Sequence, residues 1–110
     1  SRVGMTGSPN SAVYCASKAA VANLTREMAL DFSDKGVRIV AVAPGMVETP
    51  MVDRQFPDGP ERKHRVMQQY PQRRFSTAKE VANVILFLAS DKASNMTGAI
   101  IPVDGGRSAQ

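Results

Sequence analysis

Tyr14 and Lys18 are the residues whose types and spacing point most directly to chemistry. They stand four positions apart in an alanine-rich run, and in a helix this spacing places both side chains on one face, one turn apart. A phenol transfers protons poorly near neutral pH unless its anion is stabilised. An ammonium at about 5 Å supplies roughly 3 kcal/mol of that stabilisation at an effective dielectric of about 20. The pair therefore indicates a proton-transfer site, although the same spacing also occurs in ordinary amphipathic helices.

Composition limits the other kinds of chemistry that the chain can support. Of its 110 residues, 43% are hydrophobic and 22% are charged, as in a typical soluble domain. No apolar run is long enough to cross a bilayer and no charged-then-apolar leader opens the sequence, so we expect a cytoplasmic protein without a membrane partner. Cys15 is the single cysteine and, in its alanine-rich surroundings, is expected to be a packing residue. With one cysteine and one histidine, we expect no metal site.

The net charge of +4 is concentrated in one basic stretch, residues 54–74. The ordinary interpretation is a solvated face; the functional alternatives are attraction of an anionic substrate or of an acidic partner protein. A nucleic-acid surface with steeply salt-dependent binding is a weaker hypothesis. Because no nucleic-acid motif with stacking aromatics is present, we expect no nucleic-acid partner. His64, within this stretch, is expected to be exposed. The basic residues are Arg54, Arg62, Lys63, Arg65, Arg73 and Arg74, with Asp58 and Glu61 between them.

The elements that must position these residues alternate between helices and apolar strands. A loop over residues 1–10 precedes a predicted amphipathic helix over 11–32. The β-branched run 37–43, stopped by Pro44 and Gly45, predicts a strand covered on both faces, which is typical of parallel sheets. The predicted core face of the first helix consists of Ala20, Val21, Leu24, Met28 and Phe32.

The second half of the chain continues this alternation. Residues 46–58 are rich in chain breakers and predict a loop, and a proline opens a predicted short helix over 60–70. The capping-box pattern at 77–80 starts a helix that runs to about Ala89, and 98–103 predicts a second buried strand. Because two parallel strands alone are marginal in water, we expect one half of a larger domain, unless self-association supplies the missing strands.

Four motifs follow one another along the chain in a specific order. They are Tyr14-Cys15-Ala16-Ser17-Lys18, the run 37–45 continuing into Val47-Glu48-Thr49, the segment 74–91 ending in Phe87-Leu88-Ala89-Ser90-Asp91, and Thr97-Gly98 leading to Val103-Asp104-Gly105-Gly106. Over essentially its whole length the chain resembles the C-terminal half of the classical short-chain dehydrogenases/reductases. The resemblance implies an α/β fold, the C-terminal half of a Rossmann-like doubly wound parallel sheet whose N-terminal half is absent. One departure is Val40, where many relatives have asparagine; we interpret it as a change in local hydrogen bonding.

The resemblance implies an oxidoreductase that transfers hydride between NAD or NADP and a ketone or secondary alcohol. The family places a catalytic serine thirteen positions before its tyrosine, and this position is Ser1. By similarity, Ser1 orients the substrate oxygen through a hydrogen bond, Tyr14 transfers the proton, and Lys18 stabilises the phenolate while it holds the nicotinamide ribose.

The same similarity implies a binding site for the nicotinamide end of the cofactor. The turn after the first strand lets the backbone approach the ring, and the Thr49 hydroxyl and the Val47 backbone bind the carboxamide. The family's glycine-rich phosphate loop, the residue that chooses between NAD and NADP, and an active-site asparagine fall outside this sequence. The residues assigned to the cofactor are Tyr14, Lys18, Pro44, Gly45, Val47 and Thr49.

By resemblance, residues 1–110 form one unit, the catalytic half of a domain, with a variable substrate lid at about 51–75. Four residues would give the lid its apolar lining, although Met67 and Tyr70 serve equally well as core contacts. The four are Met51, Phe56, Met67 and Tyr70.

The expected partners are a small-molecule carbonyl or alcohol and further copies of the chain. A carrier-protein-bound substrate would suit the basic lid, because carrier proteins are acidic. Family resemblance implies a homodimer formed through the helix 11–32 and a homotetramer supported by the C-terminal strand. The alternative is that the 110-residue chain by itself is an inactive fragment or an oligomerisation module.

Overall fold

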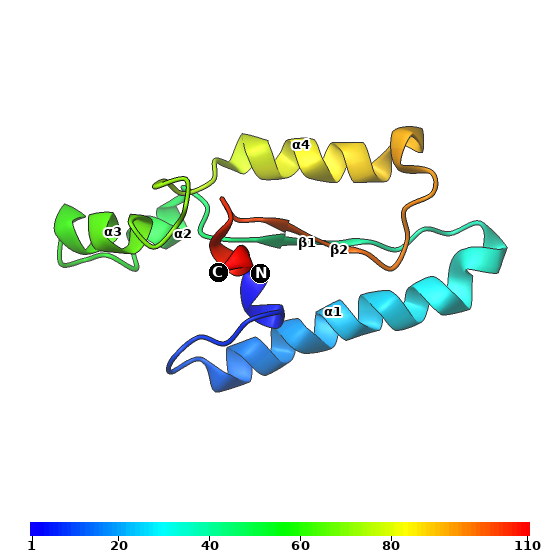
Figure 1. Ribbon diagram of the computed structural model, residues 1–110, viewed down its shortest axis with the longest axis horizontal. Helices are drawn as coiled ribbons and strands as arrows, with labels where there is room; N and C mark the ends of the chain where they lie inside the picture. Colours follow the sequence, from blue (N-terminus) through cyan, green and yellow to red (C-terminus); the bar gives the residue numbers. More distant parts are fainter.

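Two parallel strands lie between two helices in the computed structural model, which describes residues 1–110 (Figure 1). Strand β1 (Ala41–Pro44) pairs with β2 (Ile100–Val103) in a register that aligns Ala41 with Ile100. Helix α4 (Ala78–Ala89) lies on one side of this sheet and helix α1 (Ala12–Phe32) on the other. The parallel α/β architecture expected from the sequence is therefore confirmed.

Helix α1 has the predicted length but presents a different face to the sheet. Its buried residues are small: Ala22, Thr25 and Ala29. Val21 and Leu24, which we predicted to be core residues, are each 53% exposed. The prediction was wrong because the small side chains form the covered face of the helix, while this chain contains nothing that covers Val21 and Leu24.

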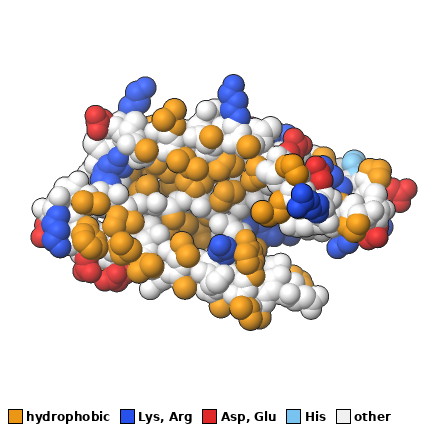
Figure 2. Space-filling view, turned by 180° about the vertical axis from the view of Figure 1, so that it is seen from behind, with side chains coloured by type: hydrophobic (Ala, Val, Ile, Leu, Met, Phe, Trp, Pro, Cys, Tyr) orange, Lys and Arg blue, Asp and Glu red, His pale blue; other side chains and the backbone are white.

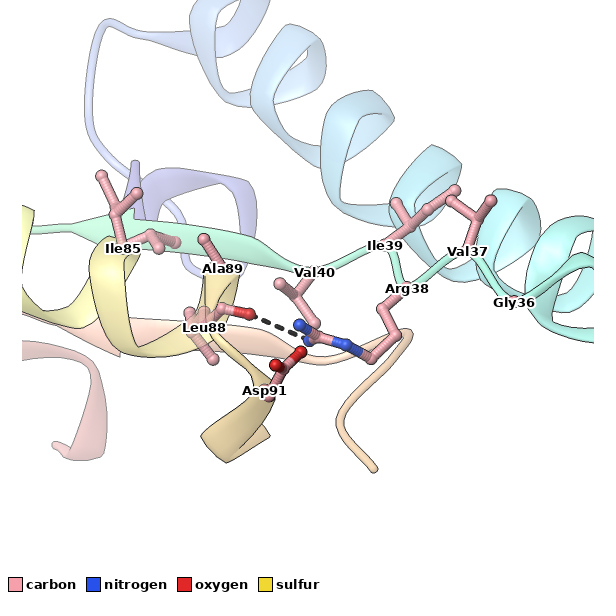
Figure 3. A pocket seen from close by; sticks show the side chains of 10 residues that line it. Gly36, Val37, Arg38, Ile39, Val40, Ile85, Leu88, Ala89 and Asp91 are labelled. Carbon is pink, nitrogen blue, oxygen red and sulfur yellow. Dashed lines mark hydrogen bonds between the residues drawn. The ribbon is translucent and has the colours of Figure 1, made fainter. Parts of the chain in front are cut away.

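Both strands are shorter than predicted. The apolar run from residue 37 to residue 40 precedes β1 and is held by a loop, because the Gly98 N–H donates to the Ile39 carbonyl at 2.7 Å and the Ile39 N–H donates to Thr97 Oγ1 at 3.1 Å. Apolar composition does not report ladder pairing, so it extended the predicted strand beyond its paired residues, and the expected burial is also incomplete, since Val37 is 47% exposed. A mainly apolar groove of about 940 Å³ follows this run toward the end of α4 (Figure 3).

Residues 46–75 form a separate small core beside the sheet. Helix α2 (Pro50–Asp53) lies within the predicted loop and was missed, because four residues are too few to show a helical period. Helix α3 (Pro60–Met67) starts at the predicted proline and ends before Tyr70. The buried members of this core are Val52, Phe56, Tyr70 and Phe75.

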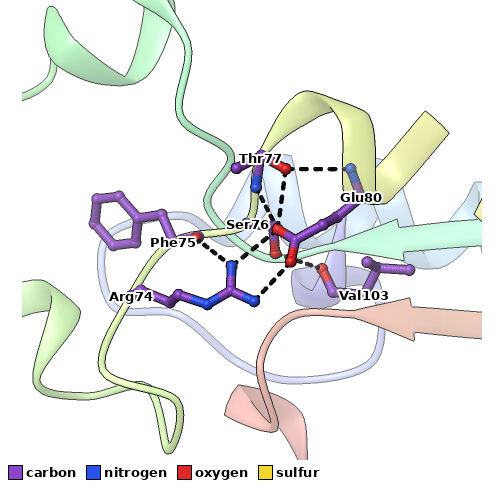
Figure 4. Close-up of polar contacts among 6 residues, drawn as sticks. All are labelled: Arg74, Phe75, Ser76, Thr77, Glu80 and Val103. Carbon is purple, nitrogen blue, oxygen red and sulfur yellow. Dashed lines mark hydrogen bonds and ion pairs between the residues drawn. The ribbon is translucent and has the colours of Figure 1, made fainter. Parts of the chain in front are cut away.

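Side chains fix both ends of α4. At its start Thr77 and Glu80 form the predicted capping box, and Arg74 holds the Glu80 carboxylate with two nitrogens at 2.6 and 2.8 Å (Figure 4). At its end the Arg38 guanidinium donates to the carbonyls of Leu88 at 2.9 Å and Ser90 at 3.1 Å (Figure 3). The helix is thus attached to the loop before β1 at one end and to the segment after the lid at the other.

The chain leaves much apolar surface uncovered. Only 11 of its 110 residues are buried, and Figure 2 shows hydrophobic side chains gathered across the middle of one face, between the layers of α4 and α1. None of the helices combines the length and the apolarity that a membrane span requires.

Candidate active site

A cavity of about 760 Å³ opens where β1 ends at Pro44. The carboxyl ends of parallel strands are the usual place for ligands in open α/β sheets. Residues from α1, from the N-terminal turn, from the segment after β1 and from the lid all reach this cavity. The predicted site residues among its lining are Ser1, Tyr14, Pro44, Gly45, Val47 and Thr49.

Lys18 lies beside the cavity and not in its lining. Its Nζ is 5.3 Å from the centre of the Tyr14 ring, as expected for residues one turn apart on α1. Lys18 is half-buried and Tyr14 is 51% exposed. The structure thus brings an ammonium against the face of a phenol whose ring borders an open cavity.

Gly4 fixes the N-terminal turn against α1. A Cβ atom at this position would lie 2.6 Å from the Lys18 carbonyl oxygen, so the space admits no side chain. The turn Arg2–Gly4 (η1) therefore packs on the helix backbone at Lys18 and directs Ser1 to the cavity. Sequence analysis gave Gly4 no role, because a close backbone approach leaves no local signal other than the glycine.

Gly45 allows three segments to meet at the end of β1. A Cβ atom here would lie 2.9 Å from the Asp104 Cβ and 3.0 Å from the Tyr70 ring. The Tyr70 hydroxyl in turn accepts a hydrogen bond from the Met46 N–H at 3.1 Å. The packing of the turn therefore requires that Gly45 has no side chain, whether or not a ligand also approaches the backbone here.

The backbone N–H and C=O groups of Val47 point away from Ser76, with which Val47 forms an isolated parallel bridge. Ser76 bonds to the residues on either side of Val47, donating to the Met46 carbonyl at 3.0 Å and accepting from the Glu48 N–H at 2.8 Å. In extended backbone, successive peptide groups point to opposite sides. The N–H and C=O of Val47 therefore point away from Ser76, on a residue that lines the cavity.

Thr49 has a structural role at the start of α2. Its Oγ1 accepts a hydrogen bond from the Val52 N–H at 3.3 Å, which makes it the N-cap of the helix. The hydroxyl hydrogen is not used in this bond. Thr49 can cap α2 and still donate into the cavity that it lines.

The lid lines the cavity with partly different residues from those predicted. Met51 and Tyr70 reach it, but Phe56 and Met67 do not. Phe56 belongs to the buried core of the lid and Met67 packs against that core. Val52 and Val66 line the cavity in their place, so the lid still contributes four apolar residues to it.

Half of the six basic residues in the stretch 54–74 have acidic partners. Arg62 pairs with Asp58 at 3.5 Å and Lys63 with Asp53 at 2.7 Å, and Arg74 pairs with Glu80 at 2.6 Å. His64 is exposed, as predicted. The partners Asp53 and Glu80 lie outside the stretch, which is why the sequence suggested a larger excess of positive charge.

Comparison with known proteins identifies the family. The family model described as "Enoyl-(Acyl carrier protein) reductase" matches residues 1–108. The 2-(S)-hydroxypropyl-CoM dehydrogenase 3 of Xanthobacter autotrophicus is 44% identical over 96% of this chain and 43% of its own length. The 3-oxoacyl-(acyl-carrier-protein) reductase FabG of Thermotoga maritima is 43% identical over 94% of this chain and 41% of its own length.

Solved structures agree with this assignment. A short-chain dehydrogenase family protein from Francisella tularensis superposes with a TM-score of 0.92 at 33% identity, covering 100% of this chain and 49% of that chain. ElxO with NADP bound gives a TM-score of 0.91 at 34% identity, with 100% and 44% coverage. The chain belongs to the short-chain dehydrogenase/reductase family, has the fold of its members, and spans less than half the length of the relatives it matches.

Proposed function

We propose that this chain is the C-terminal catalytic half of a short-chain dehydrogenase/reductase domain that interconverts a ketone and a secondary alcohol with NAD or NADP. One observation carries the proposal: Ser1, Tyr14 and the segment after β1, which come from three separate parts of the chain, line the same cavity at the carboxyl end of the sheet. The dehydrogenase and reductase relatives, and the NADP-bound neighbour, support the reaction class.

Three side chains carry the proton chemistry. The Ser1 hydroxyl donates a hydrogen bond to the substrate oxygen. The Tyr14 hydroxyl gives a proton to that oxygen in reduction, and the Tyr14 phenolate takes a proton from it in oxidation. The Lys18 ammonium, which lies 5.3 Å from the Tyr14 ring centre, stabilises the phenolate that reduction leaves behind.

The residues after β1 fit the carboxamide of a nicotinamide. Val47 offers both a backbone donor and a backbone acceptor on the side facing away from Ser76, and Thr49 offers a hydroxyl hydrogen. When bound, the dinucleotide supplies or accepts the hydride. Pro44 and Gly45 shape the turn that presents these groups.

The substrate class follows the reactions in the relatives' names. One relative is a 3-oxoacyl-(acyl-carrier-protein) reductase and another oxidises a hydroxypropyl compound. We place the substrate of this protein among small ketones and secondary alcohols, including carrier-linked ones, with the lid at about 51–75 closing over it.

The test is made in the full-length protein that contains this chain. Tyr14→Phe should abolish turnover while dinucleotide binding, measured by fluorescence titration, is retained. Lys18→Met should lower turnover by at least about tenfold. Lys35→Met is the matched control, because Lys35 also lies over an aromatic ring, 4.7 Å from the centre of Phe32, and Phe32, unlike Tyr14, does not line the cavity. Full activity of Tyr14→Phe would refute the assignment.

A second candidate function is an inactive or oligomer-forming module. It is favoured by the exposed apolar residues of α1, where Val13 is 85% and Leu30 82% exposed. In the full-length protein we propose that α1 pairs with its counterpart across a two-fold axis, with β2 supporting a tetramer. Titration of the isolated 110-residue chain with NAD and NADP separates the two candidates: tight binding would argue against the inactive module.

A further inference from the structure

We propose that the cavity selects substrates that carry an oxoanion group, a carboxylate, sulfonate or phosphate, held by Arg62 and Arg107 while the carbonyl lies at Ser1 and Tyr14. The inference rests on the proposed function and adds to it the chemical class of the substrate. It is carried by the charge of the cavity lining and by an unpaired buried nitrogen of Arg107.

The lining of the cavity is charged with one sign. Among its 19 residues are three arginines and neither aspartate nor glutamate. Arg2 comes from the N-terminal turn, Arg62 from α3, and Arg107 from the segment after β2. Because a cavity with positive walls concentrates anions, a neutral substrate would leave this charge without a counterpart.

Arg107 has a donor that nothing in the structure satisfies. Its Nη2 donates to Gln69 Oε1 at 3.3 Å, but its Nε is the one buried side-chain nitrogen or oxygen without a hydrogen-bond partner. Arg107 also forms no ion pair. A buried unpaired donor is costly, more so on a charged group, so a small movement of Arg107 that brings its Nε to an acceptor on a ligand would remove this cost.

Arg62 is held loosely and can turn to a ligand. Its partner Asp58 lies at 3.5 Å, and the two side chains are 53% and 75% exposed, so their attraction is weak in water. The guanidinium also lies over the Phe56 ring, 5.9 Å from its centre, which steadies it at the edge of the lid core. A planar guanidinium matches the paired oxygens of a carboxylate, sulfonate or phosphate.

The placement of the arginines separates anion binding from proton transfer. Arg62 belongs to the lid and Arg107 to the segment after β2. Ser1 belongs to the N-terminal turn and Tyr14 to α1. All four line one cavity. A substrate that meets both sets of groups must therefore have two functional ends, an oxidisable alcohol or reducible carbonyl and an anion.

The experiment compares a carboxylate ketone with its neutral methyl ester, 4-oxopentanoate and methyl 4-oxopentanoate, in the full-length protein. The wild type should prefer the carboxylate in kcat/KM. Arg107→Met and Arg62→Met should each reduce this preference by about tenfold or more, mainly through KM, because each removes a charge-assisted hydrogen bond. Arg65→Met is the control, since Arg65 is an exposed arginine of α3 outside the lining. Equal use of both ketones by the wild type would overturn the proposal while leaving the oxidoreductase assignment intact.

A second measurement uses sulfate as a probe of the anion site. Sodium sulfate should compete with the ketone in the wild-type protein and should bind in calorimetry even to Tyr14→Phe. A loss of NADP affinity in Arg107→Met, with ketone preference unchanged, would assign the arginine to a cofactor phosphate and overturn the substrate assignment. Absence of any sulfate effect would also count against the site.

Discussion

Gly4 shows how one missing side chain positions the Ser1 turn on α1. A Cβ at this position would meet the Lys18 carbonyl oxygen at 2.6 Å, and helix backbone cannot move aside as a flexible side chain can. The position of Ser1 at the cavity that Tyr14 also lines therefore depends on a contact between two backbones.

Gly4→Ala should lower turnover and destabilise the full-length protein by about 1–3 kcal/mol, the usual cost of an overpacked contact. Gly7→Ala is the matched control, because a Cβ at Gly7 would meet nothing within 4 Å. Turnover and thermal unfolding of the two variants give the comparison. If both glycines tolerate alanine equally, the close contact at Gly4 does not position Ser1.

Single residues of the site differ in how far the sequence could predict them. Tyr14 and Lys18 were visible because a helix places residues four apart on one face. The unpaired Nε of Arg107 could not be predicted, because it depends on where Gln69 lies after the lid has folded. The sequence likewise could not predict which apolar lid residues are exposed, as Met51 is, and which are buried in the lid core, as Phe56 is, because this depends on packing.

At the scale of elements, the start of α4 depends on one carboxylate. Glu80 accepts from Arg74 and from the Thr77 backbone, in that order of importance, and these bonds lower its pKa to about 2 from an ordinary value of 4.5 (Figure 4). Because the folded state holds this proton less tightly than the unfolded state, Glu80 contributes stability above pH 4.5, and the contribution is lost as the pH falls toward about 2.

Glu80→Gln should therefore destabilise the full-length protein near neutral pH and converge with the wild type as the pH is lowered from 4.5 to about 2. Denaturant unfolding at several pH values measures the difference. Glu61→Gln, an exposed carboxylate of α3 that forms no ion pair, provides the control. A difference between Glu80→Gln and wild type that is the same at every pH would contradict the role of the Arg74 and Thr77 bonds.

Helices could be predicted because nearby residues define their ends and their period. The bounds of the strands could not, because they depend on pairing with a distant part of the chain. Capping residues and helical period located α4 and the length of α1 correctly. The bounds of β1 depend on β2, which lies far along the chain, so the apolar run from residue 37 gave a strand that starts too early. The face of α1 that becomes covered likewise depends on where the sheet lies relative to the helix.

At the scale of the whole molecule, the sheet has two strands, and few residues are buried. A sheet of this size is marginal in water without further strands or layers, and β1 pairs with a single neighbour. The apolar groove along residues 36–40 and the hydrophobic face in Figure 2 are left uncovered in this chain.

The isolated 110-residue chain should therefore either melt without a cooperative transition or associate. Thermal unfolding followed by circular dichroism, together with size-exclusion chromatography coupled to light scattering, tests this. Val13→Lys should reduce association, because it places a charge on an 85% exposed apolar residue of α1. A cooperative melt of a monomer would show that the two-stranded sheet suffices by itself.

The pairing of β1 with β2 also bears on how the protein is made by the ribosome. Ala41 aligns with Ile100, so 59 positions of chain separate the partners. The turn at Gly45, whose N–H donates to the Val103 carbonyl at 3.1 Å, stays incomplete until β2 has left the exit tunnel. Long-range parallel pairing forms slowly for the same reason. The helix that carries Tyr14 is thus synthesised before β2, and the cavity beside it is completed only after Arg107, which also lines it, has left the exit tunnel.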